Sequence, residues 1–472
     1  MKALQDWVKL LGTLKIPVLA STVQEIAVLR KDEDSVTGRD LSNILLHDPL
    51  MTLKVLRFSQ SRLTRRQPTE VTTVEHALMM HGLSSFFREM RDLAPLETQL
   101  AAHPKALDGA LRVISRAVHA ASLARNFSAL RHDMDSDEVV TSALLHDLAE
   151  LLLWCAAPTT ALQIEHMVRH HRGLRSATAQ QACLGFTLVD LQLALAREWK
   201  LPSLLLTLMD DAHATHPRAL TVSLSVALAR HCANGWHDAA LPSDFAELQK
   251  LANLAPEAVQ RWTNQSTLQA ARLWKHIGIR PAAAWLPMGP GEWPEPEAEL
   301  VAEPVESVLV EVTQQLTTLS RDRGDYHCVV ALVFYALTMG LGLRRLWFGA
   351  IDASGKKVEP RQTLLLDAGL LPGELSYELK STHLFARLMV KVQSVWFNTA
   401  QRDKLGVLLP PALLSRIGRH EFFAISILVK GQPYGLIYAD GGRLRQQLGE
   451  REYGAFKNLC RVANEALERM AA

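Results

Sequence analysis

His146 and Asp147 are the adjacent residues of this 472-residue sequence that are best suited to chemistry. An imidazole nitrogen and a carboxylate oxygen can bind one divalent metal ion, and the carboxylate can also bridge to a second ion. A metal centre needs further ligands from other helices, and the candidates are His119, Asp190, Asp210 and Asp211. In one interpretation, this set of residues forms a hydrolytic metal centre.

The same two residues have a second interpretation, as a polar pair that is hydrogen-bonded inside a helical bundle. Arg112 or Arg116 would then neutralise the carboxylate. We favour this interpretation, because a His-Asp dipeptide alone supplies too few ligands to hold a metal ion. The sequence has no Gly-x-Ser-x-Gly nucleophile motif, no phosphate-binding Gly-x-x-x-x-Gly-Lys motif and no Cys-x-x-Cys.

The composition indicates a globular chain without a broad basic surface. Hydrophobic residues make up 48% and charged residues 21%, and 51 Lys and Arg against 49 Asp and Glu leave a net charge of +2. This excludes a disordered chain and argues against nucleic-acid binding. The longest weakly polar run, 329–343, is shorter than the roughly 20 residues of a membrane span. We therefore expect a cytoplasmic protein with neither a membrane nor a nucleic-acid partner.

Residues 281–304 divide the sequence into two parts of different character. This stretch contains six prolines and five glutamates, with no lysine or arginine. Proline removes backbone donors and like charges repel, so we expect an extended linker. The predicted domains are therefore 1–280 and 305–472.

Residues 1–280 read as one helix after another. Apolar residues recur at helical spacing, and we expect an all-α region of at least about eleven helices. Asp48 before Pro49 predicts an N-cap and a first helical turn. Thr72 with Glu75 predicts a capping box for the next helix, which Gly82 would end.

Residues 305–472 contain both apolar residues at helical spacing and runs with the alternation of a β-strand. Helical stripes lie in 305–319, 385–392 and 453–470, and strand-like runs lie in 343–351 and 362–366. The segments 422–429 and 434–439, separated by Lys-Gly-Gln, predict a β-hairpin. This part is therefore predicted to be α+β.

Four short motifs follow one another along the helical region. They are Asp48-Pro49 with Leu56 and Ser61, Ala77-Leu-Met-Met-His-Gly82, Leu144-Leu-His-Asp-Leu148, and Leu184-Gly-Phe186 with Trp199-Lys-Leu-Pro202. In order and spacing they resemble an HDOD domain over roughly residues 10–280. The resemblance implies a relative of the HD-type metal-dependent phosphohydrolases, which include cyclic-di-GMP phosphodiesterases. HDOD domains generally lack the full metal set.

The sequence departs further from a complete metal site. Where many relatives carry a His after Leu-Gly-Phe it has Thr187, and where a His-His pair often follows Trp-x-Leu-Pro it has Asp210 and Asp211. By this resemblance His119, His146 and Asp147 are vestiges of a metal site. We expect no catalytic residue and no cofactor, and a divalent metal only if the chain is a phosphohydrolase after all.

The predicted hairpin, with Gly435 and Asp440 in its second strand, resembles that of a GAF domain. GAF domains usually bind small molecules or mediate dimerisation through their flanking helices. Either the helical stripes pair across a two-fold axis or they pack on their own sheet. Pocket candidates, with core packing as the alternative, are Trp347, Trp396, Phe397 and Asn398.

The sequence as a whole predicts a multidomain signalling protein. Its all-α HDOD, HD-like bundle would be a non-catalytic output domain, regulated by an α+β GAF-like domain that binds a ligand or dimerises. The expected partners are a signalling protein, a small-molecule ligand of the GAF-like domain and a second copy of the chain. The alternative is a metal-dependent phosphohydrolase acting on a nucleotide or cyclic dinucleotide.

Overall fold

The computed structural model describes most of the chain, and the statements below concern this part. The described residues are 2–62, 70–133, 135–170, 175–210, 216–235, 238, 240–274, 305–319, 326–352, 354–366, 376–381, 383–390, 393–409, 411–442 and 445–471. The predicted linker 281–304 lies outside the described residues, as does Asp211.

Backbone contacts divide the chain into two compact units. The helical unit comprises Gln5–Leu162 and Leu188–Ala298, and the sheet unit comprises Met1–Leu4, Gln163–Thr187 and Glu299–Ala472. The units are therefore interleaved along the sequence. The domain boundaries 1–280 and 305–472 remain a prediction.

Up to residue 274 the described elements are helices, as predicted. They are α1 (Lys2–Gly12), α2 (Ala20–Leu29), η1 (Arg30–Ser35), α3 (Gly38–Leu45), α4 (Pro49–Arg62), α5 (Val74–His81), α6 (Leu83–Glu89), α7 (Leu96–Gln99), α8 (Pro104–Leu130), α9 (Ser136–Leu145), α10 (Leu148–Ala156), α11 (Pro158–His170), α12 (Ser176–Leu184), α13 (Leu188–Glu198), α14 (Ser203–Met209), α15 (Pro217–Asn234), α16 (Leu241–Ala252) and α17 (Pro256–Leu273).

Asp48 caps α4, as its position before Pro49 predicts. The carboxylate is fully buried. Its Oδ1 accepts hydrogen bonds from the backbone N–H of Leu50 at 2.9 Å and of Met51 at 3.1 Å. Its Oδ2 accepts from the N–H of Leu19 at 2.8 Å and from the hydroxyl of Thr22 at 2.9 Å. One side chain thus satisfies free donors of α4 and also ties it to α2.

The cap of α5 lies one residue later than the sequence predicts. Thr73 accepts the hydrogen bond from the N–H of His76 at 3.2 Å. Thr72 instead donates to Glu138 at 2.9 Å, a contact between segments far apart in the sequence. Gly82 follows α5 with a φ of 77°, so the predicted end is correct.

The sheet unit contains one six-stranded antiparallel sheet with the order β3-β2-β1-β6-β5-β4. Its strands are β1 (Arg345–Ile351), β2 (Lys357–Leu365), β3 (Tyr377–Glu378), β4 (Ser394–Phe397), β5 (Phe422–Val429) and β6 (Gln432–Asp440). The predicted hairpin is β5–β6, and the predicted strands 343–351 and 362–366 overlap β1 and β2. The two short strands β3 and β4 lie at the sheet edges and were not predicted.

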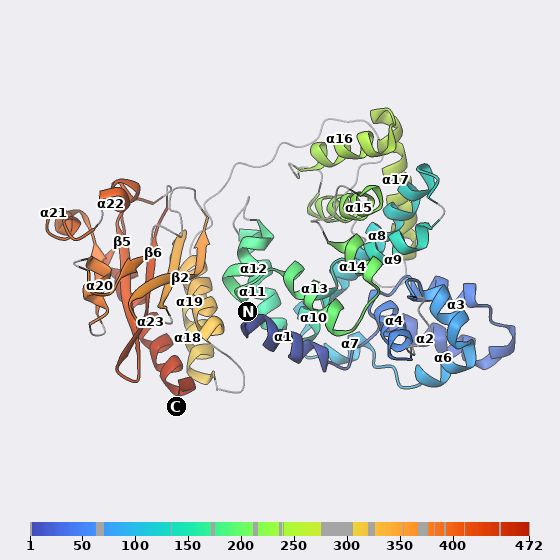
Figure 1. The fold of residues 1–472 in the computed structure, drawn as a ribbon, viewed down its shortest axis with the longest axis horizontal. Coiled ribbons are helices and arrows are strands. Elements are labelled where there is room, and N and C mark those ends of the chain that lie inside the picture. Colours follow the sequence, from blue (N-terminus) through green and yellow to red (C-terminus); the bar gives the residue numbers. More distant parts are fainter. Residues whose placement is uncertain are drawn as a thin grey trace. The chain divides into compact units, whose positions relative to one another are not determined.

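Helices cover both faces of this sheet (Figure 1). On one face Trp347, Phe422 and Tyr438 form a core with the short helices, and on the other Phe423 packs on Phe456 of α23. Beyond residue 304 the helices are α18 (Glu306–Thr318), α19 (Tyr326–Leu341), α20 (Leu384–Leu388), η4 (Thr399–Gln401), α21 (Arg402–Gly406), α22 (Pro411–Ile417) and α23 (Glu450–Ala471).

The apolar stripes of α18 and α23 pack within their own unit. Val312 and Leu316 of α18 and Phe456 and Ala466 of α23 are all fully buried. Of the two interpretations of these stripes, the structure therefore shows packing inside the chain.

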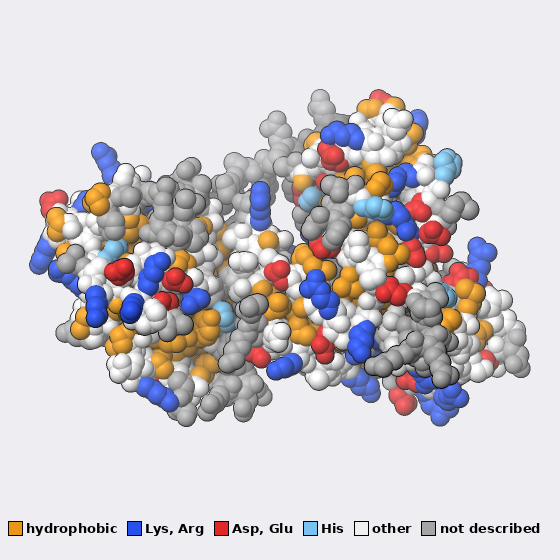
Figure 2. Space-filling view, viewed as in Figure 1, with side chains coloured by type: hydrophobic (Ala, Val, Ile, Leu, Met, Phe, Trp, Pro, Cys, Tyr) orange, Lys and Arg blue, Asp and Glu red, His pale blue; other side chains and the backbone are white. Residues whose placement is uncertain are grey.

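One stretch of the described residues, Ser136–Ala156, is long and apolar enough to cross a membrane. It is broken at residues 146 and 147 into α9 and α10, and 78% of its apolar window is buried inside the protein. These are core helices of the helical unit. On the face in Figure 2, Lys and Arg side chains are interspersed with Asp and Glu, which fits the near-zero net charge.

Candidate functional site

His146 and Asp147 lie at a break between two helices rather than inside one helix. His146 follows the last residue of α9, and Asp147 precedes the first residue of α10. Both side chains are buried, with exposed fractions of 9% and 10%, and a hydrogen bond of 3.2 Å joins His146 Nδ1 to Asp147 Oδ1. The chain therefore buries a carboxylate in the helical unit, which requires a compensating charge.

Two arginines supply that charge. Arg230 of α15 donates to Asp147 Oδ1 at 2.8 Å, and the guanidinium of Arg116 on α8 lies 3.8 Å from Asp147 Oδ2. Arg116 also donates to Glu150 of α10 at 2.8 Å. These two guanidinium groups supply the positive charge beside the Asp147 carboxylate.

The charges around Asp147 keep it ionised. Burial alone would raise its pKa, but Arg230, the hydrogen bond from His146 and Arg116 together hold the pKa of Asp147 well below its usual value. Fixed cationic side chains of the protein thus neutralise the carboxylate of Asp147.

The prediction that Arg112 or Arg116 neutralises Asp147 is correct for Arg116. Arg112 pairs with Asp108 on its own helix at 2.6 Å. Arg230 was not predicted. It lies 83 residues from Asp147, and nothing in the local sequence indicates that α15 approaches this site.

The side chain of His119 is hydrogen-bonded to another helix and not to the Asp147 cluster. It is 1% exposed on α8, and its Nε2 shares a hydrogen bond of 2.9 Å with the hydroxyl of Thr267 on α17. Burial lowers the pKa of His119 to about 4, so the ring is neutral at physiological pH. The ring supports the packing of α8 against α17.

The two remaining candidate ligands that the structure describes, Asp190 and Asp210, do not complete a metal site. Asp190 is exposed in the first turn of α13, and Asp210 follows the end of α14. Among the described residues, no three His, Cys, Asp or Glu side chains are grouped so that they could hold a metal ion. His146 Nε2 is buried without a hydrogen-bond partner, but the cations on Asp147 oppose a divalent ion there. The residues present do not fit the metal of an HD-type enzyme.

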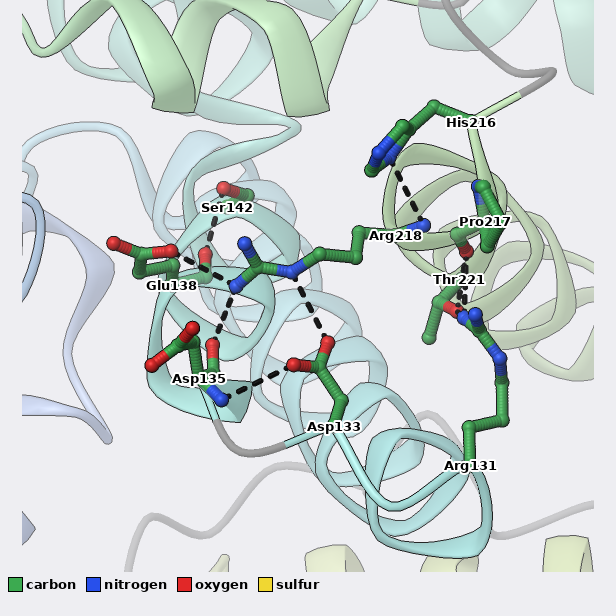
Figure 3. A network of polar contacts seen from close by, with 9 residues as sticks. All are labelled: Arg131, Asp133, Asp135, Glu138, Ser142, His216, Pro217, Arg218 and Thr221. Carbon is green, nitrogen blue, oxygen red and sulfur yellow. Dashed lines mark hydrogen bonds and ion pairs between the residues drawn. The ribbon is translucent and has the colours of Figure 1, made fainter.

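A third arginine, Arg218 of α15, pairs with acidic residues of α9 and of the loop before it (Figure 3). Arg218 donates to Asp133 Oδ2 at 3.0 Å, to the carbonyl of Asp135 at 2.5 Å and to Glu138 Oε2 at 2.8 Å. His216, whose Nδ1 accepts from the N–H of Arg218 at 3.3 Å, caps the same helix. This network fixes the loop between α8 and α9 to the start of α15.

The four residues predicted for a GAF-like pocket do not lie on one surface. Trp396 and Phe397 are neighbours on β4 and point to opposite faces of the sheet: Phe397 stacks on Phe422 at 4.7 Å, and Trp396 lies near Tyr453 of α23 at 5.9 Å. Asn398 caps η4 by accepting from the N–H of Gln401.

Trp347 is fully buried and shares its face of the sheet with Phe397.

An aromatic cluster around Trp347 was missed by the sequence analysis. The ring of Tyr377 on β3 lies 6.4 Å from Trp347, and His383 stacks on Tyr377 at 5.0 Å. Trp347 Nε1 and the hydroxyl of Tyr377 are both buried, and neither has a hydrogen-bond partner among the described residues. No local pattern marks β3, so this cluster could be found only from the fold.

Comparisons with known proteins agree with the resemblance in the helical region. Residues 16–215 match the HDOD domain family. A search of curated proteins found no match to the chain. The predicted fold class is confirmed at the level of architecture: a helical region that contains the HDOD match is followed by an α+β region.

Three solved structures illustrate the similarity. The MmoQ response regulator from Methylococcus capsulatus is 19% identical, with 52% of this chain and 97% of that chain covered and a TM-score of 0.40. A virulence factor from Campylobacter jejuni is 15% identical over 57% and 99%, with a TM-score of 0.39. The phycoerythrobilin-bound GAF domain from a cyanobacterial phytochrome is 14% identical over 35% and 95%, with a TM-score of 0.27.

Proposed function

We propose that this chain, whose residues 16–215 match the HDOD domain family, is a cytoplasmic signalling protein in which the HDOD region is a non-catalytic output module. The observation that carries the proposal is the pair of arginines on Asp147. A phosphohydrolase centre needs a divalent ion at this carboxylate to activate water and to bind the phosphate. Here Arg116 and Arg230 neutralise the carboxylate.

A hydrolysis assay tests this proposal. The purified chain is incubated with bis(p-nitrophenyl) phosphate and with cyclic dinucleotides in the presence of Mn²⁺, Mg²⁺ or Fe²⁺. We expect rates equal to those of a buffer blank for every metal. Metal-dependent turnover that disappears in Asp147→Ala and persists in Asp108→Ala would instead establish the phosphohydrolase alternative.

For the GAF-like domain we propose a small-molecule ligand on the Trp347 face of the sheet. A buried donor without a partner costs about 1–3 kcal/mol, and Trp347 Nε1 and the Tyr377 hydroxyl are two such donors in one aromatic cluster. Burial raises the pKa of Tyr377 far above its usual value, so its hydroxyl remains a donor. These features suit a flat apolar ligand that carries hydrogen-bond acceptors.

A thermal-shift screen tests the ligand proposal. Nucleotides and cyclic dinucleotides are compared with and without divalent metals, because any compound that binds the native state raises the melting temperature. A genuine ligand of this face loses most of its stabilising effect in Tyr377→Phe. A ligand whose effect is unchanged by that substitution binds elsewhere.

The remaining partners are a downstream signalling protein and a second copy of the chain. Because the apolar stripes of α18 and α23 are buried within their own unit, a homodimer would use other faces of these helices. Val310 of α18 is 61% exposed on such a face. Analytical ultracentrifugation of Val310→Asp against the unaltered chain tests its involvement, and identical sedimentation would exclude it.

A further inference from the structure

Residues Gln163–Thr187 belong to the HDOD match by sequence but to the sheet unit by their contacts. The segment contains the end of α11 and the whole of α12. Within the sheet unit, α12 packs against α19 and β2. The apolar side of α12 is completely covered, and its buried residues are Ala179, Ala182, Cys183 and Leu184.

The carboxyl end of α12 is capped by the sheet. The last carbonyls of a helix have no partner within the helix. Gln362 of β2, which is 4% exposed, donates from its side-chain amide to the carbonyl of Ala182. Gly185 then ends the helix with a φ of 80°, and a Cβ added there would lie 3.0 Å from His327 Nδ1 of α19. The surface formed by β2 and α19 therefore fits the end of α12 in both hydrogen bonding and shape.

The end of α11 is held in the same way. His166 Nδ1 and the hydroxyl of Tyr335 on α19 share a hydrogen bond of 2.8 Å, and their rings are stacked. Gln163 donates to Gln315 of α18 at 3.4 Å. Polar contacts thus fix two successive helices of the segment to the sheet unit.

The division between the two units falls inside α11. This helix runs from Pro158 to His170, with Leu162 assigned to the helical unit and Gln163 to the sheet unit. Ala157 alone separates α11 from α10, the helix that begins directly after Asp147. A helix moves as a stiff rod, so a displacement of its docked end is carried to its other end.

We infer that α12 and the end of α11 form a built-in coupling element, through which a change in the sheet unit reaches the α10 segment next to the Asp147 cluster. β2 carries Gln362 on the face towards α12, and its neighbour β1 carries Trp347 on the opposite face. A rearrangement of this sheet edge therefore alters the cap of α12 directly. This coupling requires that α12 docks on the sheet with different free energies in two states of the sheet.

Hydrogen–deuterium exchange of the full-length chain tests the inference. Gln362→Met removes the donor to α12 at similar volume, and Tyr335→Phe removes the partner of His166. We expect each substitution to speed amide exchange in residues 176–184 about fivefold to tenfold, the effect of losing one hydrogen bond. The double variant is expected also to speed exchange in residues 148–162.

Glu359→Gln is the matched control, because Glu359 lies on β2 with a side chain that is 42% exposed and paired only with solvent-facing Lys357 in the described contacts. It should leave both regions unchanged. Unchanged amide exchange in residues 176–184 in both single variants would contradict the docking of α12 on the sheet unit. Faster amide exchange in residues 176–184, together with unchanged exchange in residues 148–162 in the double variant, would contradict the coupling between α12 and the α10 segment. Neither outcome depends on metal, ligand or hydrolysis, so this result is independent of the proposed function.

Discussion

At the scale of single residues, the chemistry of the helical unit is decided by what neutralises Asp147. A cation beside a buried carboxylate stabilises its ionised form, and Asp147 has two guanidinium groups beside it. Arginine is always charged and binds carboxylates in a fixed geometry. The same residues that give the site its HD-like sequence therefore stabilise the fold.

Asp147→Asn tests this structural role. The substitution keeps the shape but leaves Arg230 without its anionic partner and Arg116 with Glu150 alone. We therefore expect the free energy of unfolding to fall by about 2 kcal/mol. Asp108→Asn, in the exposed pair with Arg112, is the control and should change stability very little. Equal effects of the two substitutions in urea denaturation would contradict the role of Asp147.

His119 predicts a particular pH dependence. Its pKa is about 4 in the folded chain against 6.5 ordinarily. Between these values the unfolded state binds more protons, so stability falls as the pH is lowered from about 6.5 to 4. His119→Gln removes this contribution, and its plot of unfolding free energy against pH should be flatter in that window. Parallel curves for the two proteins would show that His119 is not buried in its neutral form.

Two buried tyrosines of the sheet unit, Tyr377 and Tyr438, differ in whether the hydroxyl is hydrogen-bonded. The hydroxyl of Tyr377 has no partner, whereas that of Tyr438 donates to Asp440 at 2.5 Å. Tyr377→Phe should therefore leave the ligand-free chain as stable as before or more stable by about 1 kcal/mol, and Tyr438→Phe should destabilise it. Destabilisation by Tyr377→Phe in thermal unfolding would mean that this hydroxyl does have a partner.

At the scale of elements, single side chains fix how helices begin. Asp48 accepts four hydrogen bonds at the start of α4. Asp48→Ala leaves buried donors unpaired, and we expect a loss of about 3 kcal/mol. Asp40→Ala, in the exposed capping box of α3, should cost far less. Similar shifts of the urea midpoint for both variants would show that the burial of Asp48 contributes nothing.

The elements that the sequence predicts correctly are those with local signals. Asp48 before Pro49, Gly82 and the alternating residues of β5 and β6 act within a few residues. The shift of the α5 cap from Thr72 to Thr73 has a non-local cause, because Glu138 binds Thr72. β3 and β4 are defined by pairing, Tyr377 with Val358 and Ser394 with Ile425, and their own residues carry no strand pattern.

At the scale of the whole molecule, the sequence divides at a proline-rich stretch while the contacts divide differently. The compact units exchange the segment Gln163–Thr187. The sequence shows α12 as an ordinary helix of the HDOD region, and no local feature indicates that Gln362 caps it. The same limit applies to Arg230, which reaches Asp147 only through the packing of α15.

This arrangement predicts that α12 depends on the sheet unit. In a chain that ends at residue 304, Ala179, Ala182 and Leu184 lose the surface that buries them. We expect amides of residues 176–184 to exchange freely in this truncated chain, while those of α8 remain protected. Full protection of 176–184 would show that the helical region holds α12 alone.

The most direct test of the proposed non-catalytic role of the HDOD region is the metal content of the full-length chain. The protein is expressed with added manganese and iron, dialysed without chelator and analysed by inductively coupled plasma mass spectrometry, beside Asp147→Ala. We expect far less than one metal ion per chain in both proteins, since Arg116 and Arg230 already neutralise Asp147. One or more ions per chain, lost in Asp147→Ala, would contradict this conclusion.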